Sequence, residues 1–490
     1  MEDLEATVSI RTLATCFAIG SCLVGSPATA DEGTASTPHY LLTPGREFTF
    51  HTEARTERDD GGTVHFVDWK VWVIGRNSDG SWRLVIRCDL TTKRNPLEVK
   101  VERDSVDTLV WSCRMFEDGH LVGATAMGTV RDPFRLFPQL PSTLDERDRG
   151  WTSSGPEQEG RTLHHRLTPG PKADGESLSI TTRSEAPQDK VYVSTHEYCA
   201  TFDGSRGVVT RVETTDRSGY LNSGITRGTI DLVGVENRGE EWAVNFDREA
   251  NRYFDAVDAY DAACKQAVRD EARCKEILTE AIAKLNEARK GLTRPVFQDA
   301  VDQKLAGHDR MVEHYAEQAK NLASRLGKAA GEWEAKDIEG KTHRLADYRG
   351  KVVVMDFWYR GCGWCMEAMP QINRLSETFR KEPVAVLGMS IDEDEKDARV
   401  VIDAMELKYP TIKAIGVPEK YGVRGYPTLI VIDKAGKIRE ILIGYSLHLY
   451  EDLSALIRDL LAENQGSTKY DSDCHLPFPR GSGSELRDRP

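Results

Sequence analysis

The stretch VVVMDFWYRGCGWCMEAMP, Val352 to Pro370, decides the fold of the C-terminal part of the chain. Its first seven residues form a near-continuous apolar run, which is typical of a strand buried on both faces of a parallel sheet. Two cysteines, Cys362 and Cys365, follow this run, and an amphipathic pattern of helical spacing comes next. Because positions i and i+3 share a helix face, the two thiols can close a disulfide with little backbone movement. The pattern predicts a switchable cysteine pair at a strand-to-helix junction.

The segments around this junction predict one α/β domain. Residues 333–348 indicate a hairpin. Beyond the cysteine pair and its helix, the sequence predicts a strand at 384–391, a helix at 394–405, strands at 428–433 and 438–443, and a helix at 447–462. With the cysteine pair at the first junction and GVRGYPTLIVID at 422–433, this order resembles the thioredoxin fold. It is most similar to the exported TlpA/ResA-like thiol-disulfide oxidoreductases, and the resemblance covers residues 329–465.

The two cysteines have different predicted roles. Cys362 begins the helix, where unpaired N–H groups and the helix dipole stabilise an anion, so we expect its pKa to be lowered and its thiol to be the nucleophile. Cys365 is expected to be more buried, and to attack Cys362 once a mixed disulfide has formed. Covalent haem attachment needs a histidine where Met366 stands, and a zinc site lacks a nearby second pair of ligands. We therefore predict no metal and no cofactor.

The resemblance implies roles for three further residues, Asp356, Tyr426 and Pro427, and the position of Trp364 between the cysteines suggests a fourth. Asp356 matches the buried carboxylate of thioredoxin, which would take the proton that Cys365 must lose; the alternative is a structural carboxylate bonded to backbone or water. Pro427 matches the cis-proline that faces the thiols in this family and exposes the backbone of Tyr426 to an extended substrate. Trp364 would enlarge an apolar surface for substrate binding, or else pack on the helix.

The first 30 residues indicate a signal peptide. Residues 12–25 form a short apolar core after Arg11, and Ala28-Thr29-Ala30 has the small-x-small pattern that a signal peptidase cleaves. The core is too short to span a bilayer. Residues 19–22 also resemble a bacterial lipobox, and acylation of Cys22 would tether the chain to a membrane. We expect cleavage after residue 30, with acylation of Cys22 or an uncleaved anchor as the alternatives, and a location in the bacterial periplasm or cell envelope.

Two regions separate the leader from the C-terminal domain. Residues 31–248 alternate in β-type runs between turn signals, which predicts an antiparallel sandwich or half-barrel of unknown role. Residues 249–328 carry two amphipathic stripes, which predict an antiparallel helical hairpin that acts as a spacer or dimerisation arm. Residues 466–490, rich in Gly, Ser, Asp and Arg, predict a disordered tail. The expected chain is multidomain, with an N-terminal antiparallel β domain, an α-helical hairpin and a C-terminal α/β thioredoxin-like domain.

The remaining cysteines are expected to be buried thiols or structural bridges. Cys264 and Cys274 lie in one predicted helix, where ten residues mean a rise of about 15 Å, so they cannot bridge unless that helix breaks. The others outside the leader and the CxxC pair are Cys88, Cys113, Cys199 and Cys474. Six cysteines allow about 15 pairings, and the sequence does not choose between them.

These observations favour an exported thiol-disulfide oxidoreductase that reduces protein disulfides through Cys362 and Cys365. Its expected partners are disulfide-containing exported proteins and an upstream electron donor. The net charge of -14 and the lack of a basic stripe with aromatics exclude nucleic acid as a partner. One alternative is a non-catalytic adaptor or binding protein with a structural disulfide. Another is a peroxiredoxin-like peroxidase, although Tyr359 stands where such enzymes carry a threonine.

Overall fold

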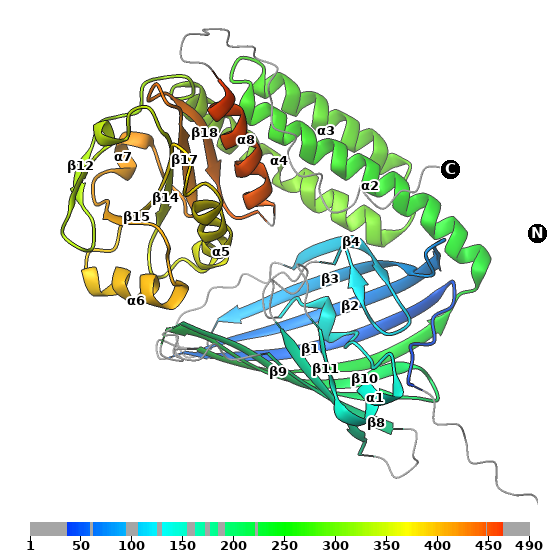
Figure 1. Cartoon of the computed structure of the whole chain (residues 1–490). Coiled ribbons are helices and arrows are strands. Elements are labelled where there is room, and N and C mark those ends of the chain that lie inside the picture. The colour runs from blue at the N-terminus through cyan, green and yellow to red at the C-terminus, as the bar shows by residue number, and fades with distance from the viewer. Residues whose placement is uncertain are drawn as a thin grey trace, which may run out of the picture. The chain divides into compact units, whose positions relative to one another are not determined.

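The computed structural model of the chain describes residues 37–463, except 59–61, 95–105, 125–129, 154–161, 172–176, 185–191, 221–223 and 447. The predicted signal peptide at 1–30 and the predicted disordered tail at 466–490 lie outside the described residues, as does Cys474. The described chain begins with a β-rich region, continues through long helices and ends in an α/β domain (Figure 1).

The β-rich region forms one antiparallel sheet. Its described strands are β1 Arg46–Arg58, β2 Thr63–Arg76, β3 Trp82–Arg94, β4 Asp107–Met115, β5 Leu121–Val122, β6 Trp151–Ser153, β7 Leu163–Pro169, β8 Ser177–Ser184, β9 Tyr192–Asp203, β10 Val208–Tyr220 and β11 Gly224–Asn237. They follow the order β5-β4-β3-β2-β1-β11-β10-β9-β8-β7-β6. The antiparallel prediction is confirmed. The sandwich alternative is wrong, because the described strands share one hydrogen-bonded sheet instead of two packed sheets.

Alternation along β2 shows how the sheet divides its side chains between two faces. Val67, Trp69 and Val71 are buried in the large apolar cluster of the β-rich region, as the period of two in a strand requires. Trp72 and Ile74 point to the opposite face and are buried in a second cluster with the long helices. The helices therefore cover part of one face of this sheet.

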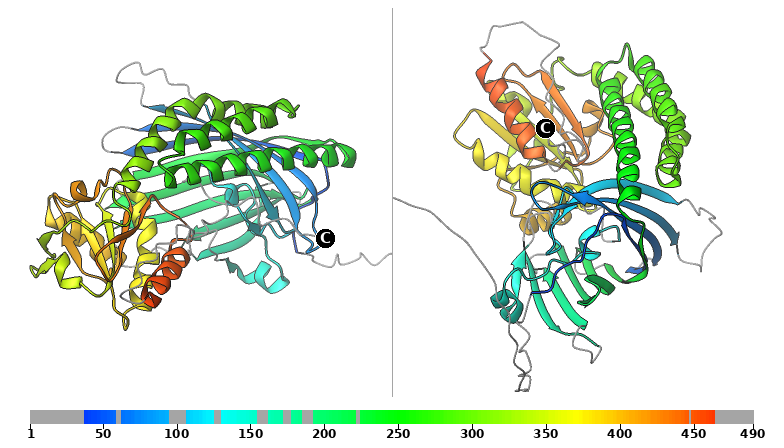
Figure 2. Two further views of the ribbon diagram at one scale, coloured as in Figure 1. Left: turned by 90° about the horizontal axis from the view of Figure 1, so that it is seen from above. Right: turned by 90° about the vertical axis from the view of Figure 1, so that its right-hand side faces the viewer.

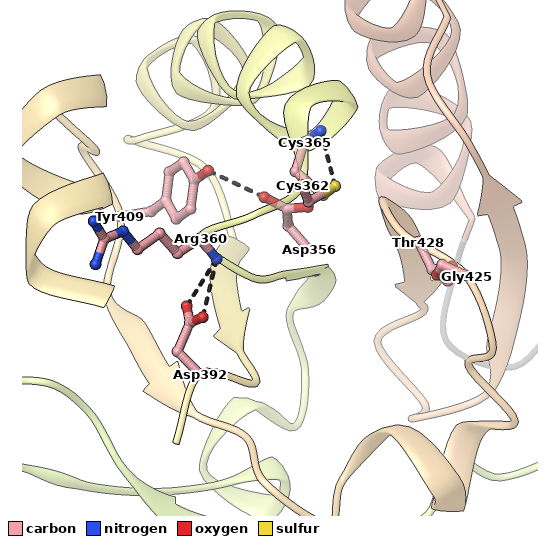
Figure 3. Close-up of a disulfide and its surroundings, with 8 residues drawn as sticks. All are labelled: Asp356, Arg360, Cys362, Cys365, Asp392, Tyr409, Gly425 and Thr428. Carbon is pink, nitrogen blue, oxygen red and sulfur yellow. Dashed lines mark hydrogen bonds between the residues drawn. A yellow bond between two sulfur atoms is a disulfide. The ribbon is translucent and has the colours of Figure 1, made fainter. Parts of the chain in front are cut away.

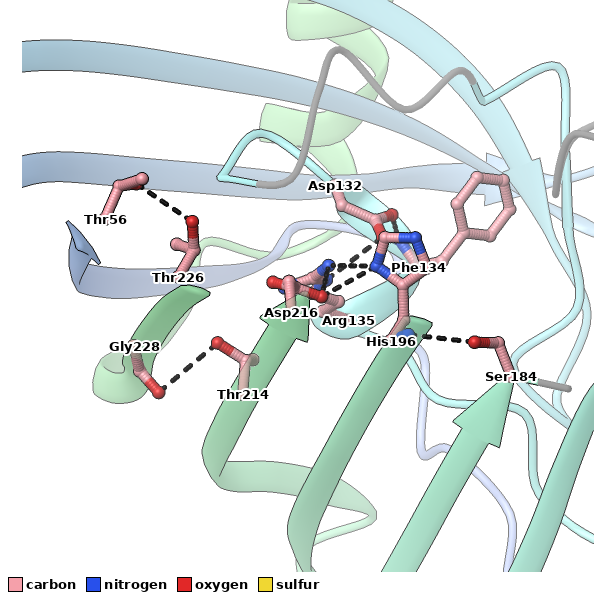
Figure 4. Close-up of polar contacts among 10 residues, drawn as sticks. All are labelled: Thr56, Asp132, Phe134, Arg135, Ser184, His196, Thr214, Asp216, Thr226 and Gly228. Atoms are coloured by element: carbon pink, nitrogen blue, oxygen red, sulfur yellow. Dashed lines mark hydrogen bonds and ion pairs between the residues drawn. The ribbon is translucent and has the colours of Figure 1, made fainter. Parts of the chain in front are cut away.

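The segment between β5 and β6 is fixed to the sheet by a buried ion pair. This segment contains the 3-10 helix η1 Pro133–Arg135 and the helix α1 Leu144–Arg149. Arg135 donates two hydrogen bonds of 2.8 Å to the two carboxylate oxygens of Asp216 on β10, and Nδ1 of His196 on β9 lies 2.7 Å from the same carboxylate (Figure 4). Burial alone would raise the pKa of Asp216, but Arg135 and His196 hold it below its ordinary value.

Three helices, and not the two predicted, follow the sheet. They are α2 Glu240–Arg269, α3 Cys274–Lys290 and α4 Pro295–Ala323, and they pack on one another (Figure 2). The predicted hairpin is wrong because the chain leaves the helical conformation at Asp270, whose carboxylate then accepts the N–H of Arg273 at 3.1 Å. The helices also begin before the expected boundary at residue 249. No helix in the described part of the chain combines the length and apolarity needed to cross a membrane.

The helix break separates two cysteines that the sequence places in one helix. Cys264 lies in α2 and Cys274 at the start of α3, and both are buried free thiols. Cys88, Cys113 and Cys199 in the sheet are also unpaired. Of the six cysteines outside the leader and the CxxC pair, the five that are described therefore form no structural bridge.

The C-terminal domain has the predicted strands and helices in the predicted order, with two unpredicted short elements, β16 Thr411–Lys413 and α7 Pro418–Tyr421, between the second helix and the antiparallel strands. Its elements are β12 Glu334–Lys336, β13 Thr342–Arg344, η3 Leu345–Tyr348, β14 Val352–Trp358, α5 Gly363–Thr378, β15 Val384–Ser390, α6 Glu395–Met405, β16 Thr411–Lys413, α7 Pro418–Tyr421, β17 Thr428–Ile432, β18 Ile438–Ile443 and α8 Leu449–Ala462. The main sheet has the order β16-β15-β14-β17-β18, in which β14, β15 and β16 are parallel and β17 and β18 are antiparallel to their neighbours. The hairpin of β12 and β13 is also formed.

The central strand β14 is buried on both faces, as its apolar run predicts. Met355 and Phe357 belong to one apolar cluster, whereas Val352 and Val354 pack with residues of α5 and α8 in another. Such a strand holds its end rigidly, so the residues that follow it start the next helix from a fixed position.

Candidate active site

The two cysteines form a disulfide at the start of α5. Their Cα atoms are 5.2 Å apart, and Cys362 is the N-cap residue of the helix. The N–H of Cys365 donates a hydrogen bond of 3.1 Å to Sγ of Cys362. Cys362 is 5% exposed and Cys365 1% exposed, so the predicted difference in burial has the expected direction but is small. The N-cap sulfur occupies the place where a helix end stabilises negative charge.

The loop before Cys362 is anchored to the neighbouring strand. The backbone N–H of Arg360 lies 3.0 Å from both carboxylate oxygens of Asp392, which follows β15 (Figure 3). The guanidinium of Arg360 forms an ion pair with Asp397 on α6. These contacts fix the short turn that leads from β14 to the helix.

Asp356 lies inside β14 and is 1% exposed. Its Oδ2 accepts a hydrogen bond of 3.2 Å from the hydroxyl of Tyr409, and its Oδ1 has no hydrogen-bond partner. Burial raises the pKa of Asp356 to about 7, and the hydrogen bond from Tyr409 opposes that rise. Figure 3 shows the Tyr409 hydroxyl directed at the Asp356 carboxyl. The partner of Oδ2 is therefore a side chain and not the backbone, and a purely structural role for Asp356 stays the alternative prediction.

The peptide bond between Tyr426 and Pro427 is cis, as predicted. Pro427 accepts a hydrogen bond of 2.8 Å from the N–H of Gly444, and Thr428 Oγ1 donates one of 2.7 Å to Gly425. The Tyr426 ring packs against the cluster that contains both cysteines. The structure therefore brings this loop and the disulfide together.

Two aromatic pairs include surface residues that lie close to the cysteines in the sequence. Trp364 is 56% exposed and stacks on Tyr445, with ring centroids 5.7 Å apart. Tyr359 is 37% exposed and meets the Tyr426 ring edge-on at 5.4 Å. Trp364 is therefore largely a surface residue, not one buried along its own helix.

Tyr409 is the site residue that the sequence prediction missed. It lies just ahead of β16, a three-residue strand that was also missed, and its signal is only a Tyr-Pro pair after a helix. No group of three or more potential metal ligands is found among the described residues.

The buried strand, the cysteine pair that begins a helix and the cis-proline ahead of an antiparallel strand define a thioredoxin-like thiol-disulfide oxidoreductase. Comparisons with known proteins place the chain more closely. A sequence model of the AhpC/TSA family matches residues 326–441. Thiol-disulfide oxidoreductase ResA of Geobacillus thermodenitrificans is 34% identical over 127 residues, which make up 26% of this chain and 73% of that protein.

Two further comparisons concern the same domain. Thioredoxin-like protein YneN of Bacillus subtilis is 30% identical over 128 residues, 26% of this chain and 75% of that protein. The solved thioredoxin domain of a thiol-disulfide oxidoreductase from Bacteroides vulgatus is 27% identical, with 27% of this chain and 97% of that chain covered and a TM-score of 0.26. Through its C-terminal domain, the chain belongs to the family of ResA-like thiol-disulfide oxidoreductases and is an enzyme of that class.

Proposed function

We propose that the chain is an exported enzyme that reduces disulfide bonds in other exported proteins through the Cys362–Cys365 pair. The observation that carries this proposal is the position of Cys362 as the N-cap of α5, disulfide-bonded to Cys365. No metal or organic cofactor takes part, because thiol-disulfide exchange needs only the two sulfurs and a proton acceptor.

Reduction begins with the thiolate of Cys362. The first turn of α5 directs its N–H groups toward this sulfur, as the 3.1 Å hydrogen bond from Cys365 illustrates, and the helix dipole adds to their effect. The thiolate attacks one sulfur of the substrate disulfide. A mixed disulfide forms, and the other substrate sulfur leaves as a thiolate.

The second step returns the pair to the disulfide. Cys365 loses its proton to Asp356 and attacks the sulfur of Cys362, and the second substrate sulfur leaves. Two electrons have then moved from the dithiol to the substrate. A pKa of about 7 suits Asp356 to this task, because such a carboxyl can both take up and release a proton near neutral pH. An upstream dithiol donor must reduce the pair again.

The surface around the disulfide suits an extended protein segment. Tyr426 packs against the cluster that contains both cysteines, so the backbone of this loop is available to pair with an extended substrate, and the exposed ring of Trp364 adds apolar area. The donor and the substrates meet the same pair of sulfurs, so they bind in turn. Export rests on the leader pattern at residues 1–30. Intact mass of the native protein tests this: a chain that begins at Asp31 is expected, whereas an acylated Cys22 would contradict cleavage.

Trapping of the mixed disulfide tests the enzymatic role. In Cys365→Ser, Cys362 can attack but the bond cannot be resolved, so exported proteins accumulate covalently on the variant and a small thiol releases them. The matched control Cys362→Ser should trap far less. If neither variant captures a partner, and iodoacetamide labels Cys362 no faster than free cysteine, the pair is structural and the adaptor alternative holds.

The reduction potential tests the direction of electron flow. A value near about -270 mV supports a reductase, whereas one near about -120 mV would show an oxidant. The match to the AhpC/TSA family favours a peroxidase as the second candidate. Consumption of hydrogen peroxide by the reduced enzyme, at a rate that exceeds its reaction with protein disulfides, would establish that candidate instead. The dimerisation of the chain through its helices is a further proposal, which sedimentation of the purified protein tests.

A further inference from the structure

Asp356 belongs to a row of residues that crosses three parallel strands. It pairs with Gly388 on β15, which in turn pairs with Thr411 on β16. Neighbours in register point to the same face of a sheet. Tyr409 precedes Thr411 by two residues and lies beyond β15 as seen from β14, yet its hydroxyl reaches the Asp356 carboxyl at 3.2 Å. Its side chain therefore crosses β15 at Gly388.

Gly388 makes this crossing fit. A Cβ atom at this position would lie 3.2 Å from Cε2 of Tyr409, 2.9 Å from Oγ1 of Thr411 and 3.1 Å from Nε1 of Trp358. The φ of Gly388 is not in the left-handed region, so space, and not backbone conformation, favours glycine here. Because Gly388 has no side chain, the ring of Tyr409 can pack directly over the backbone of β15.

The side chain of Tyr409 leads to buried polar atoms that have few hydrogen-bond partners. Asp356 Oδ1, Trp358 Nε1 and Thr411 Oγ1 are all buried without a partner, and the three residues are at most 4% exposed. Buried polar atoms without partners are rare in native proteins, and a catalytic role is one of the explanations for them. Because Tyr409 occupies Oδ2, Oδ1 is the carboxyl oxygen left to exchange a proton.

We propose that Tyr409 is a positioning residue for the reaction of Cys365, which holds Asp356 by one oxygen and leaves the other to accept the proton. Gly388 is the second part of this arrangement, because it lets the tyrosine reach across β15. The inference rests on the proposed function, in which Asp356 is the base for the second step of exchange.

The groups that face Asp356 make its proton affinity depend on Tyr409. The Tyr409 hydroxyl ahead of β16 is hydrogen-bonded to the carboxyl, Gly388 on β15 contributes no ionisable group, and the disulfide-bonded Cys362 and Cys365 at the start of α5 do not titrate in this state. Apart from burial, the Tyr409 hydrogen bond is the contribution that moves the pKa of Asp356, and it lowers that pKa. Loss of the hydroxyl must therefore raise it.

The second step can be isolated in the full-length reduced protein with dithiobis(nitrobenzoate). Cys362 attacks this disulfide and releases one coloured thiolate; Cys365 then attacks the mixed disulfide and releases the second. The leaving thiolate needs no proton, so the slower first-order phase follows the deprotonation of Cys365. This phase is measured from about pH 5 to about pH 9, since the base must be ionised to act. The variant Cys365→Ser identifies the slower phase, because this phase is absent when residue 365 carries no thiol.

In this profile the rate of the slower phase rises with pH as Asp356 ionises, which is the acid limb, and then reaches a plateau. Tyr409→Phe should move the acid limb to higher pH by about one unit, a tenfold change in the proton affinity of Asp356, and leave the plateau similar. The matched control is Tyr421→Phe, which removes another buried hydroxyl of the same domain, bonded to the carbonyl of Gly331 at 2.5 Å. Its profile should overlay that of the unchanged protein. Gly388→Ala keeps the hydroxyl but crowds the ring, and should move the limb in the same direction if Tyr409→Phe does not fold.

Asp356→Asn separates failure of the inference from failure of the proposed function. If Asp356→Asn loses the acid limb while Tyr409→Phe, or Gly388→Ala in its place, overlays the unchanged protein, Tyr409 has no positioning role and the proposed function stands. If the Asp356→Asn profile itself overlays that of the unchanged protein, Asp356 is not the base, and both the proposed second step and this inference fall. Carbon-13 spectra of carboxyl-labelled aspartate give the same comparison directly, through the titration midpoint of Asp356.

Discussion

The stability of the C-terminal domain should depend on pH through the ionisation of Asp356. Replacement of Asp356 by asparagine should remove this contribution. In the folded protein its pKa is about 7, against an ordinary value of 3.8. The folded state therefore keeps a proton that the unfolded state releases, and stability falls as the pH rises from about 4 to about 7. One pH unit corresponds to about 1.4 kcal/mol, so this single carboxyl accounts for a loss of about 4 kcal/mol.

The asparagine variant has no carboxyl to ionise. At about pH 4 the two proteins should differ only by the packing of the amide, whereas at about pH 8 the variant should be more stable by up to about 4 kcal/mol beyond that difference. Hydrogen exchange of residues 352–358 in increasing urea, corrected for intrinsic rates, reports the unfolding free energy of this domain within the full chain. The control Asp403→Asn changes an exposed carboxyl on α6. A gap between variant and unchanged protein that is equal at both pH values would refute the reasoning.

Two further predictions concern a buried charge and an exposed ring. Asp216→Ala should destabilise the β-rich region by about 3–5 kcal/mol, because it leaves the buried Arg135 without its main partner; pulse proteolysis in urea measures this, and Asp231→Ala, at an exposed ion pair, should cost about 1 kcal/mol or less. Trp364→Ala should lower kcat/KM for protein disulfides about tenfold while the rate with a small disulfide is unchanged. Equal losses with both substrates would exclude a binding role for this ring, and Val244→Ala, an exposed residue of α2, is the control.

The C-terminal domain could be predicted from the sequence because its strongest signals are local. The apolar run at 352–358 exceeds what a half-buried strand shows, and the observed strand has those bounds. The cysteine spacing and the motif around Pro427 then leave few alternatives for the site. In contrast, the strand Thr411–Lys413 has three residues, too few for any periodicity to emerge.

Other features depended on contacts that no local pattern carries. The break between α2 and α3 occurs in a segment without glycine or proline, and the Asp270 carboxylate accepts the Arg273 N–H in place of a helical carbonyl. Tyr409 meets Asp356 only because the register of three strands brings Gly388 between them. The single sheet likewise follows from pairings between distant strands, and alternation along each strand is the same in a sandwich.

The pairing of β1 with β11 has a consequence for how the β-rich region is made. Arg46 pairs with Asn237, so the first and last strands of the region are neighbours at the centre of the sheet. This central pairing can form only after the last strand has been made. Until then each meander presents an open edge on a strand of more than ten residues, and such edges recruit strands from other chains. Closure of so long a loop is slow. Because synthesis starts at the N-terminus, the edge of β1 that pairs with β11 stays open until residues 224–237 have been made, whereas its other edge can pair with β2 early, so one exposed strand edge persists through the synthesis of this region.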